Sequence, residues 1–150
     1  MIRARSLALQ CVAHDPMLLR NCSRRLKDDR EVVRAAVTVD GSALEYASDR
    51  LQEDRDIVMT ALCHEGPLKF ASPLLRSDRS MVYYEVNLDY QALEFASEEL
   101  KADRDLVMFA VQRFGEALQF AAPALKGDIL IVRAALQQVR IPWLRAAFGL

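Results

Sequence analysis

The sequence lacks a charge excess and any long apolar run. Its 20 lysines and arginines face 21 aspartates and glutamates, which leaves a net charge of −1. This balance disfavours a nucleic-acid binder that works through an overall positive field. Charged residues recur every few positions, so no apolar run approaches the roughly 20 residues of a membrane-spanning helix. We therefore predict no membrane span.

Cysteine and histidine are also scarce. Cys11, Cys22 and Cys63 form no C-x-x-C pair, and their odd number leaves one over in any disulfide scheme. This usage favours a reducing, intracellular compartment, and we expect the cytoplasm. Because 52% of the residues are hydrophobic, the composition still excludes wholesale disorder.

A repeat of 24 or 25 residues runs through the chain. Each copy carries an Asp at the same position, and in the first four copies an Arg follows it: Asp29-Arg30, Asp54-Arg55, Asp78-Arg79, Asp103-Arg104 and Asp128. We treat residues 1–150 as one repeat domain. Residues 1–21 form a partial repeat, 22–120 four full repeats, and 121–150 a degenerate last repeat or cap.

The segment after each Asp has the periodicity of an amphipathic helix. In the first full copy the apolar positions are Val32, Val33, Ala36 and Val37. The preceding Asp can cap the free N–H groups of the first turn. We expect Gly41, Gly66 and Gly115 to stop these helices in the left-handed conformation. One column of small residues should let neighbouring helices approach closely: Ala36, Ala61, Ala110 and Ala135.

Two shorter helical pieces complete each copy. The first has the form Leu-x-aromatic-Ala, at residues 44–47, 68–71, 93–96 and 118–121. The second is a one-turn helix, and Ser72-Pro73 is typical of its start. No stretch alternates as a strand does. Such units become stable by stacking, so we predict an all-α, right-handed-type α-solenoid of about six short helical repeats.

The combined pattern is Leu-x-[Tyr/Phe]-Ala-Ser-x-x-Leu-[Lys/Gln/Arg]-x-Asp-Arg-x-x-Val, followed by a helix and a Gly. It resembles the tandem repeat family known as domain of unknown function 4116. The resemblance implies a repeat architecture and brings no activity. Three positions depart from the pattern: Tyr90 replaces the Gly, Glu85 replaces the small Ala, and Ile129-Leu130 replace the Arg and the acidic residue.

No motif for catalysis, a metal or a cofactor is present, so we expect no enzyme, no cofactor and no metal. Cys63-His64-Glu65 is a tempting triplet, but neighbouring helical residues point in different directions. His14 and His64 lie two repeats apart and should be too distant to share a metal. We expect both to be solvated helix-end residues. Cys11 and Cys22 fall on alanine positions, which predicts small buried side chains.

The recurring arginines have two interpretations. Arg30, Arg55, Arg79 and Arg104 could each reach a carboxylate of the same or an adjacent unit, such as Asp29 or Asp54. Alternatively, they could form a row that binds an acidic peptide, phosphate groups or nucleic acid. The alternating acids would neutralise such a row, so we favour the structural ladder.

Aromatic residues accumulate in the third and fourth units. We predict a partner-binding patch made of six residues: Tyr83, Tyr84, Tyr90, Met108, Phe109 and Phe114. The alternative is that some of them deepen the core. The C-terminal end is also apolar, through Ile129, Leu130, Ile131, Trp143 and Phe148. Either residues 141–150 cover it as a cap, or it supports self-association or docking of further repeats.

We therefore predict a non-enzymatic scaffold or accessory protein that mediates protein–protein interaction, with another protein or further repeats as its partner. One alternative is a phosphate- or nucleic-acid-binding array on the arginine column. Another is a regulatory or structural module of a longer multidomain protein.

Overall fold

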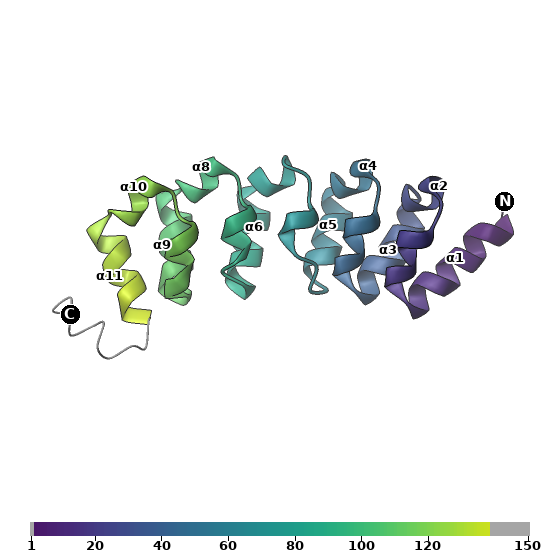
Figure 1. Cartoon of the computed structure of the whole chain (residues 1–150), viewed down its shortest axis with the longest axis horizontal. Helices are drawn as coiled ribbons and strands as arrows, with labels where there is room; N and C mark the ends of the chain where they lie inside the picture. The colour runs from purple at the N-terminus through teal and green to yellow at the C-terminus, as the bar shows by residue number, and fades with distance from the viewer. Residues whose placement is uncertain (1, 139–150) are drawn as a thin grey trace. The chain divides into compact units, whose positions relative to one another are not determined.

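The computed structural model describes residues 2–138, and this part of the chain contains helices and no strand (Figure 1). The predicted all-α class is confirmed. Among the described residues, no helix has both the length and the apolar character to cross a membrane. The predicted cap, residues 141–150 with Trp143 and Phe148, lies outside the described residues.

Each full repeat contributes one long helix and two short ones, as the sequence predicts. The long helices are α1 (Ile2–His14), α3 (Arg30–Val39), α5 (Arg55–Leu62), α6 (Arg79–Leu88), α9 (Arg104–Arg113) and α11 (Ile129–Gln138). The Leu-x-aromatic-Ala segments form η1 (Pro16–Asn21), η2 (Gly41–Tyr46), η3 (Leu68–Phe70), α7 (Ala92–Phe95) and η5 (Gly115–Phe120), in which η marks a 3-10 helix. The third pieces are α2 (Arg24–Lys27), α4 (Asp49–Gln52), η4 (Leu75–Ser77), α8 (Glu98–Lys101) and α10 (Pro123–Lys126).

The chain divides into two compact units, Met1–Leu75 and Arg76–Leu150. In the first unit α3 packs between α1 and α5, and in the second α9 packs between α6 and α11 (Figure 1). The single domain over residues 1–150 stays a prediction.

The long helices from α3 onward begin where the sequence predicts, because an Asp caps each of these five helices. The Asp54 carboxylate accepts hydrogen bonds from the backbone N–H groups of Asp56 and Ile57, at 3.0 and 3.2 Å. Four others make the same pair of bonds: Asp29, Asp78, Asp103 and Asp128. Such a cap stabilises a helix by about 1 kcal/mol.

A second series of aspartate caps was not predicted. Asp15, Asp40 and Asp89 each accept a hydrogen bond from the backbone N–H two residues on, at 2.8 to 3.0 Å. All three occupy the same position of the repeat, before the second helical piece. The recurrence of Asp at this position in the sequence could have predicted these caps.

The predicted role of the glycines was wrong. Neither Gly41 nor Gly66 has a positive φ, and the left-handed residue is Glu65, with a φ of 62°. The glycines are needed because two backbones meet. A Cβ on Gly41 would lie 2.0 Å from the carbonyl oxygen of Ala61 and 2.5 Å from the backbone nitrogen of Gly66. Here the N–H of Gly41 also donates to the carbonyl of His64, at 2.8 Å. Gly115, in the same column, likewise begins a 3-10 helix.

The apolar stripes of the long helices form the core. Ala36, Ala61 and Ala110 are fully buried, and Ala135 is 3% exposed, as the close-approach prediction requires. Cys11 and Cys22, in contrast, are half-buried and not fully buried as predicted. They lie in α1 and directly after η1, near the start of the described residues, where α1 packs on α3 and η1 and on no earlier helix among the described residues. Their sulfur atoms therefore keep some exposure.

A backbone hydrogen bond links each of four short third helices, α2, α4, η4 and α8, to the following repeat. The N–H groups of Ser48 and Ser72 donate to the carbonyls of Lys27 and Gln52 in the first unit, at 2.9 and 3.0 Å. The same bond recurs in the second unit between Ser97 and Arg76 and between Ala122 and Lys101. Consecutive repeats within a unit are thus joined in a constant register.

Candidate functional site

The arginine column forms a ladder of ion pairs between consecutive repeats. Arg30 donates through Nε to the Asp54 carboxylate at 2.8 Å and through Nη2 to Asp56 at 3.0 Å. The same Nε bond joins residues 24 positions apart in three further pairs: Arg5 with Asp29 (2.6 Å), Arg79 with Asp103 (2.8 Å) and Arg104 with Asp128 (3.0 Å). The predicted structural ladder is confirmed for these pairs.

The ladder also changes the acidity of its carboxylates. The guanidinium of Arg30 lowers the pKa of Asp54, and the backbone N–H groups of α5 lower it further. The pKa values of Asp29, Asp103 and Asp128 are lowered in the same way, each first by its arginine. Each of these guanidiniums thus has a carboxylate of the next repeat beside it, which offsets its charge.

The predicted patch residues meet in two groups in the second unit. Tyr83 on α6 stacks on Phe109 of α9, with ring centroids 4.2 Å apart and an interplanar angle of 22°. We call this pair the Tyr83 stack. Tyr83 is 42% exposed and Phe109 is half-buried. The stack therefore presents aromatic surface to solvent on the long helices.

The second group, the Tyr90 cluster, is made of Tyr90, Phe114 and Phe120. The Tyr90 ring lies 5.8 Å from that of Phe114 and 6.2 Å from that of Phe120, measured between centroids. Phe120 was missed, although it is the aromatic residue of a Leu-x-aromatic-Ala segment. All three side chains are half-buried.

The two remaining predicted residues, Tyr84 and Met108, are half-buried on α6 and α9. The patch of six residues stays a prediction. The Tyr83 stack is the part with the most exposed aromatic area.

Glu85 is the unusual charged residue of the second unit. It occupies the column of the buried alanines and is half-buried, and its Oε2 atom is buried without a hydrogen-bond partner among the described residues. Burial raises its pKa to about 7, and the nearby charge of Asp89 adds to the effect. Other repeats place the methyl group of an alanine at this position, where Glu85 places a carboxyl group.

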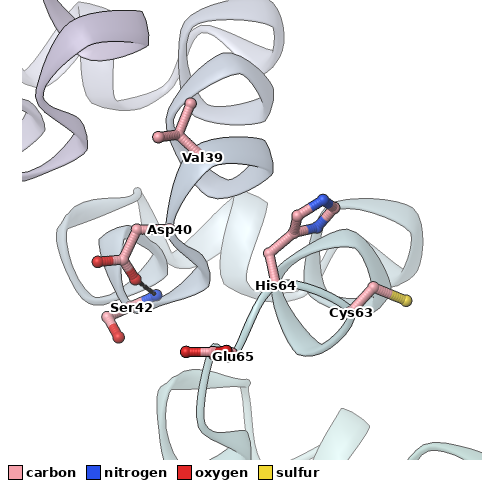
Figure 2. A pocket seen from close by; sticks show the side chains of 6 residues that line it. All are labelled: Val39, Asp40, Ser42, Cys63, His64 and Glu65. Carbon is pink, nitrogen blue, oxygen red and sulfur yellow. Dashed lines mark hydrogen bonds between the residues drawn. The ribbon is translucent and has the colours of Figure 1, made fainter.

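A polar pocket of about 470 Å³ lies in the first unit and is lined by Val39, Asp40, Ser42, Cys63, His64 and Glu65 (Figure 2). Figure 2 shows the Cys63 thiol pointing away from Asp40, Ser42 and Glu65. The His64 Nδ1 lies 2.8 Å from the carbonyl of Thr60, so this nitrogen carries the proton. No group of three metal-ligating side chains occurs among residues 2–138. His64 is half-buried and not fully solvated, whereas His14 is exposed.

A second pocket of the first unit, of about 550 Å³, is lined by Arg24, Arg25, Asp28, Ser48, Asp49 and Arg50. It lies between the short helices α2 and α4, which the bond from Ser48 to Lys27 holds together. The repeat pattern alone did not predict this pocket, because its residues come from two copies of the repeat.

The helices, caps and ion-pair ladder define an all-α protein of tandem helical repeats. The chain belongs to the family described as Domain of unknown function (DUF4116), which matches residues 5–52, 30–67, 54–101 and 103–141. The predicted resemblance is confirmed. No curated protein and no solved structure matches the chain.

Proposed function

We propose that the chain is a non-enzymatic scaffold or accessory protein whose partner is another protein, and that the Tyr83 stack is its main contact. In this proposal the repeats continue as one right-handed-type α-solenoid of about six units. The observation that carries the proposal is the solvent-exposed stacking of Tyr83 on Phe109 at 4.2 Å.

A repeat does not need this aromatic pair in order to fold. The first full copy has Arg34 at the position of Tyr83 and Ala35 at that of Phe109, and it still forms its helix. Leaving aromatic area in water is unfavourable by about 25 cal/mol for each Å². Tyrosine and phenylalanine are enriched in the cores of protein interfaces, where a partner removes that area from water.

The alternative of a phosphate- or nucleic-acid-binding array on the arginine column receives less support. The Nε atoms of Arg30, Arg79 and Arg104 each contact an Asp of the next repeat. A phosphate would have to compete with these carboxylates for the guanidinium charge. The second alternative is a regulatory or structural module of a longer multidomain protein. It is compatible with a scaffold role, because such a module could use the Tyr83 stack to contact another part of the same protein.

The test compares capture of protein partners by the wild-type chain with capture by the double variant Tyr83→Ser/Phe109→Ser. We expect the double variant to lose the partner while its circular dichroism spectrum and melting temperature stay close to those of the wild type. The matched control is Leu7→Ser, which removes a 61% exposed apolar side chain from the first unit. The control should retain the partner.

Capture that survives in the double variant would contradict the proposed contact. Capture that weakens steeply with salt in every variant would instead support the arginine-column alternative, because phosphate contacts release counterions.

A further inference from the structure

The pocket lined by Arg24, Arg25, Asp28, Ser48, Asp49 and Arg50 has a charge distribution that the repeat does not explain. We call it the Arg24 pocket. It belongs to the first unit and shares no residue with the Tyr83 stack. A ligand of this pocket is therefore independent of the proposed protein contact.

One wall of the pocket is a fixed hydrogen-bonded group. Arg50 donates through Nε to the Asp28 carboxylate at 2.9 Å and through Nη2 to the Asp28 carbonyl at 2.7 Å. The Ser48 hydroxyl donates to the same carboxylate at 2.5 Å. These bonds, with Ser48 first and Arg50 second, lower the pKa of Asp28. The carboxylate therefore stays ionised and holds the Arg50 guanidinium at the pocket.

The pocket is also lined by Arg24 and Arg25 of α2, both exposed. The lining residues thus bring three guanidiniums together with two carboxylates, those of Asp28 and Asp49. The pocket keeps an excess of positive charge next to a serine hydroxyl. Guanidinium groups bind phosphate through paired N–H donors, and they stay charged at every physiological pH.

The repeat itself does not require these arginines. At the positions of Arg24 and Arg25 the later copies carry Asp49-Arg50, Pro73-Leu74, Glu98-Glu99 and Pro123-Ala124. All of these sequences support a short third helix or turn. The local sequence is also the most basic part of the unit's first half, because residues 16–27 contain Arg20, Arg24, Arg25 and Lys27 and no acidic residue.

We propose that the Arg24 pocket binds one phosphate group, as a phosphomonoester, between Arg24, Arg25 and Arg50. The phosphate oxygens accept hydrogen bonds from the guanidiniums. The monoester is carried either by a small metabolite or by a phosphorylated serine or threonine of a protein. A nucleic-acid backbone fits less well, because it needs a track of basic residues and the chain as a whole has a net charge of −1.

The experiment titrates the full chain with O-phosphoserine, with a phosphoserine peptide and with its unphosphorylated form. Binding is followed by calorimetry and by the arginine Nε–H signals in NMR spectra. The variants are Arg24→Gln/Arg25→Gln and, as a matched control, Arg34→Gln, which removes an exposed arginine of the same repeat outside the pocket. Circular dichroism checks that all variants fold.

We expect saturable binding of both phosphorylated probes, none of the unphosphorylated peptide, and an affinity that rises as pH passes through about 6, where a phosphomonoester takes its second charge. The double variant should bind about tenfold more weakly or worse, since it loses two charge-assisted contacts. The control should be unchanged. A peptide that binds much more tightly than O-phosphoserine identifies a protein source, and equal affinities identify a small phosphomonoester.

Three results would overturn the proposal. The first is the absence of saturable binding by either phosphorylated probe. The second is an equal loss in the Arg34→Gln control, which would indicate general surface charge. The third is tighter binding of a single-stranded oligonucleotide than of either probe, with a steep dependence on salt, which would indicate a nucleic-acid surface.

Discussion

Replacing Glu85 should stabilise the protein in a way that depends on pH. Glu85 stands where Ala36, Ala61 and Ala110 are fully buried in other copies, and one of its oxygens is buried without a hydrogen-bond partner among the described residues. Two substitutions separate the effect of the Glu85 charge from the effect of its side-chain size. Glu85→Gln keeps the size and removes the charge, whereas Glu85→Ala restores the residue of the column.

The direction of the pH dependence is set by the raised pKa of Glu85. The folded chain holds the Glu85 proton up to a pKa of about 7, whereas the ordinary glutamate pKa, which applies to the unfolded chain, is 4.5. Below pH 4.5 both states are protonated, and the carboxyl group has no charge to bury. As pH rises from 4.5 to about 7 the unfolded state ionises first, so the native state loses stability. Above about pH 7 the loss is complete.

The size of this loss has an upper limit of about 3.4 kcal/mol, at about 1.36 kcal/mol for each tenfold change in acid dissociation. Glu85 is only half-buried, so solvent screens its charge. We therefore expect about 1 kcal/mol. At pH 8 the Glu85→Gln variant should be more stable than the wild type by that amount, and well below pH 4.5 the difference should disappear.

The assay is urea unfolding of the wild type, both variants and the control Glu94→Gln at a series of pH values. Glu94 is an exposed glutamate of α7 and should show no such gap. All other titrating groups contribute equally to the free energy of unfolding of each variant at a given pH, so their contributions cancel in the comparison. A gap between the wild type and Glu85→Gln that is independent of pH, or larger in acid, would refute the reasoning.

Three further predictions concern the packing and the ladder. Gly41→Ala should lower stability by about 3 kcal/mol in thermal unfolding, because its Cβ would lie 2.0 Å from a backbone oxygen; Gly127→Ala, whose Cβ would meet its nearest atom at 3.7 Å, should cost nothing. Asp54→Ala should lose a cap and an ion pair, about 1.5 kcal/mol in urea unfolding, whereas the exposed Asp56→Ala should lose less than about 0.5 kcal/mol. Because the pKa of Asp54 is lowered, its stabilisation should fade as pH drops below the ordinary aspartate range, and Arg30→Gln should flatten that acid dependence; an unchanged dependence would contradict the ladder.

Much of the fold could be predicted because it rests on local interactions. The Asp29 and Asp54 caps, the stripe of Val32 and Val33, and the two short helical pieces depend on residues a few positions apart. The same is true of the repeat, since copies with the same sequence make the same helix. An ion pair of Arg30 was also predicted, with Asp29 or Asp54 named as examples of its partner, and the structure selects Asp54 of the next copy.

The features that the sequence could not show arise where different copies meet. Gly41 is required by the backbone of the next repeat and not by its own φ, and the Tyr90 cluster and the Arg24 pocket join side chains of two or more segments. Their formation depends on the spacing and rotation of stacked helices, which local propensity does not specify. The order of the helices thus follows from short-range chemistry, whereas the candidate surfaces exist only because packing brings separate copies within contact distance.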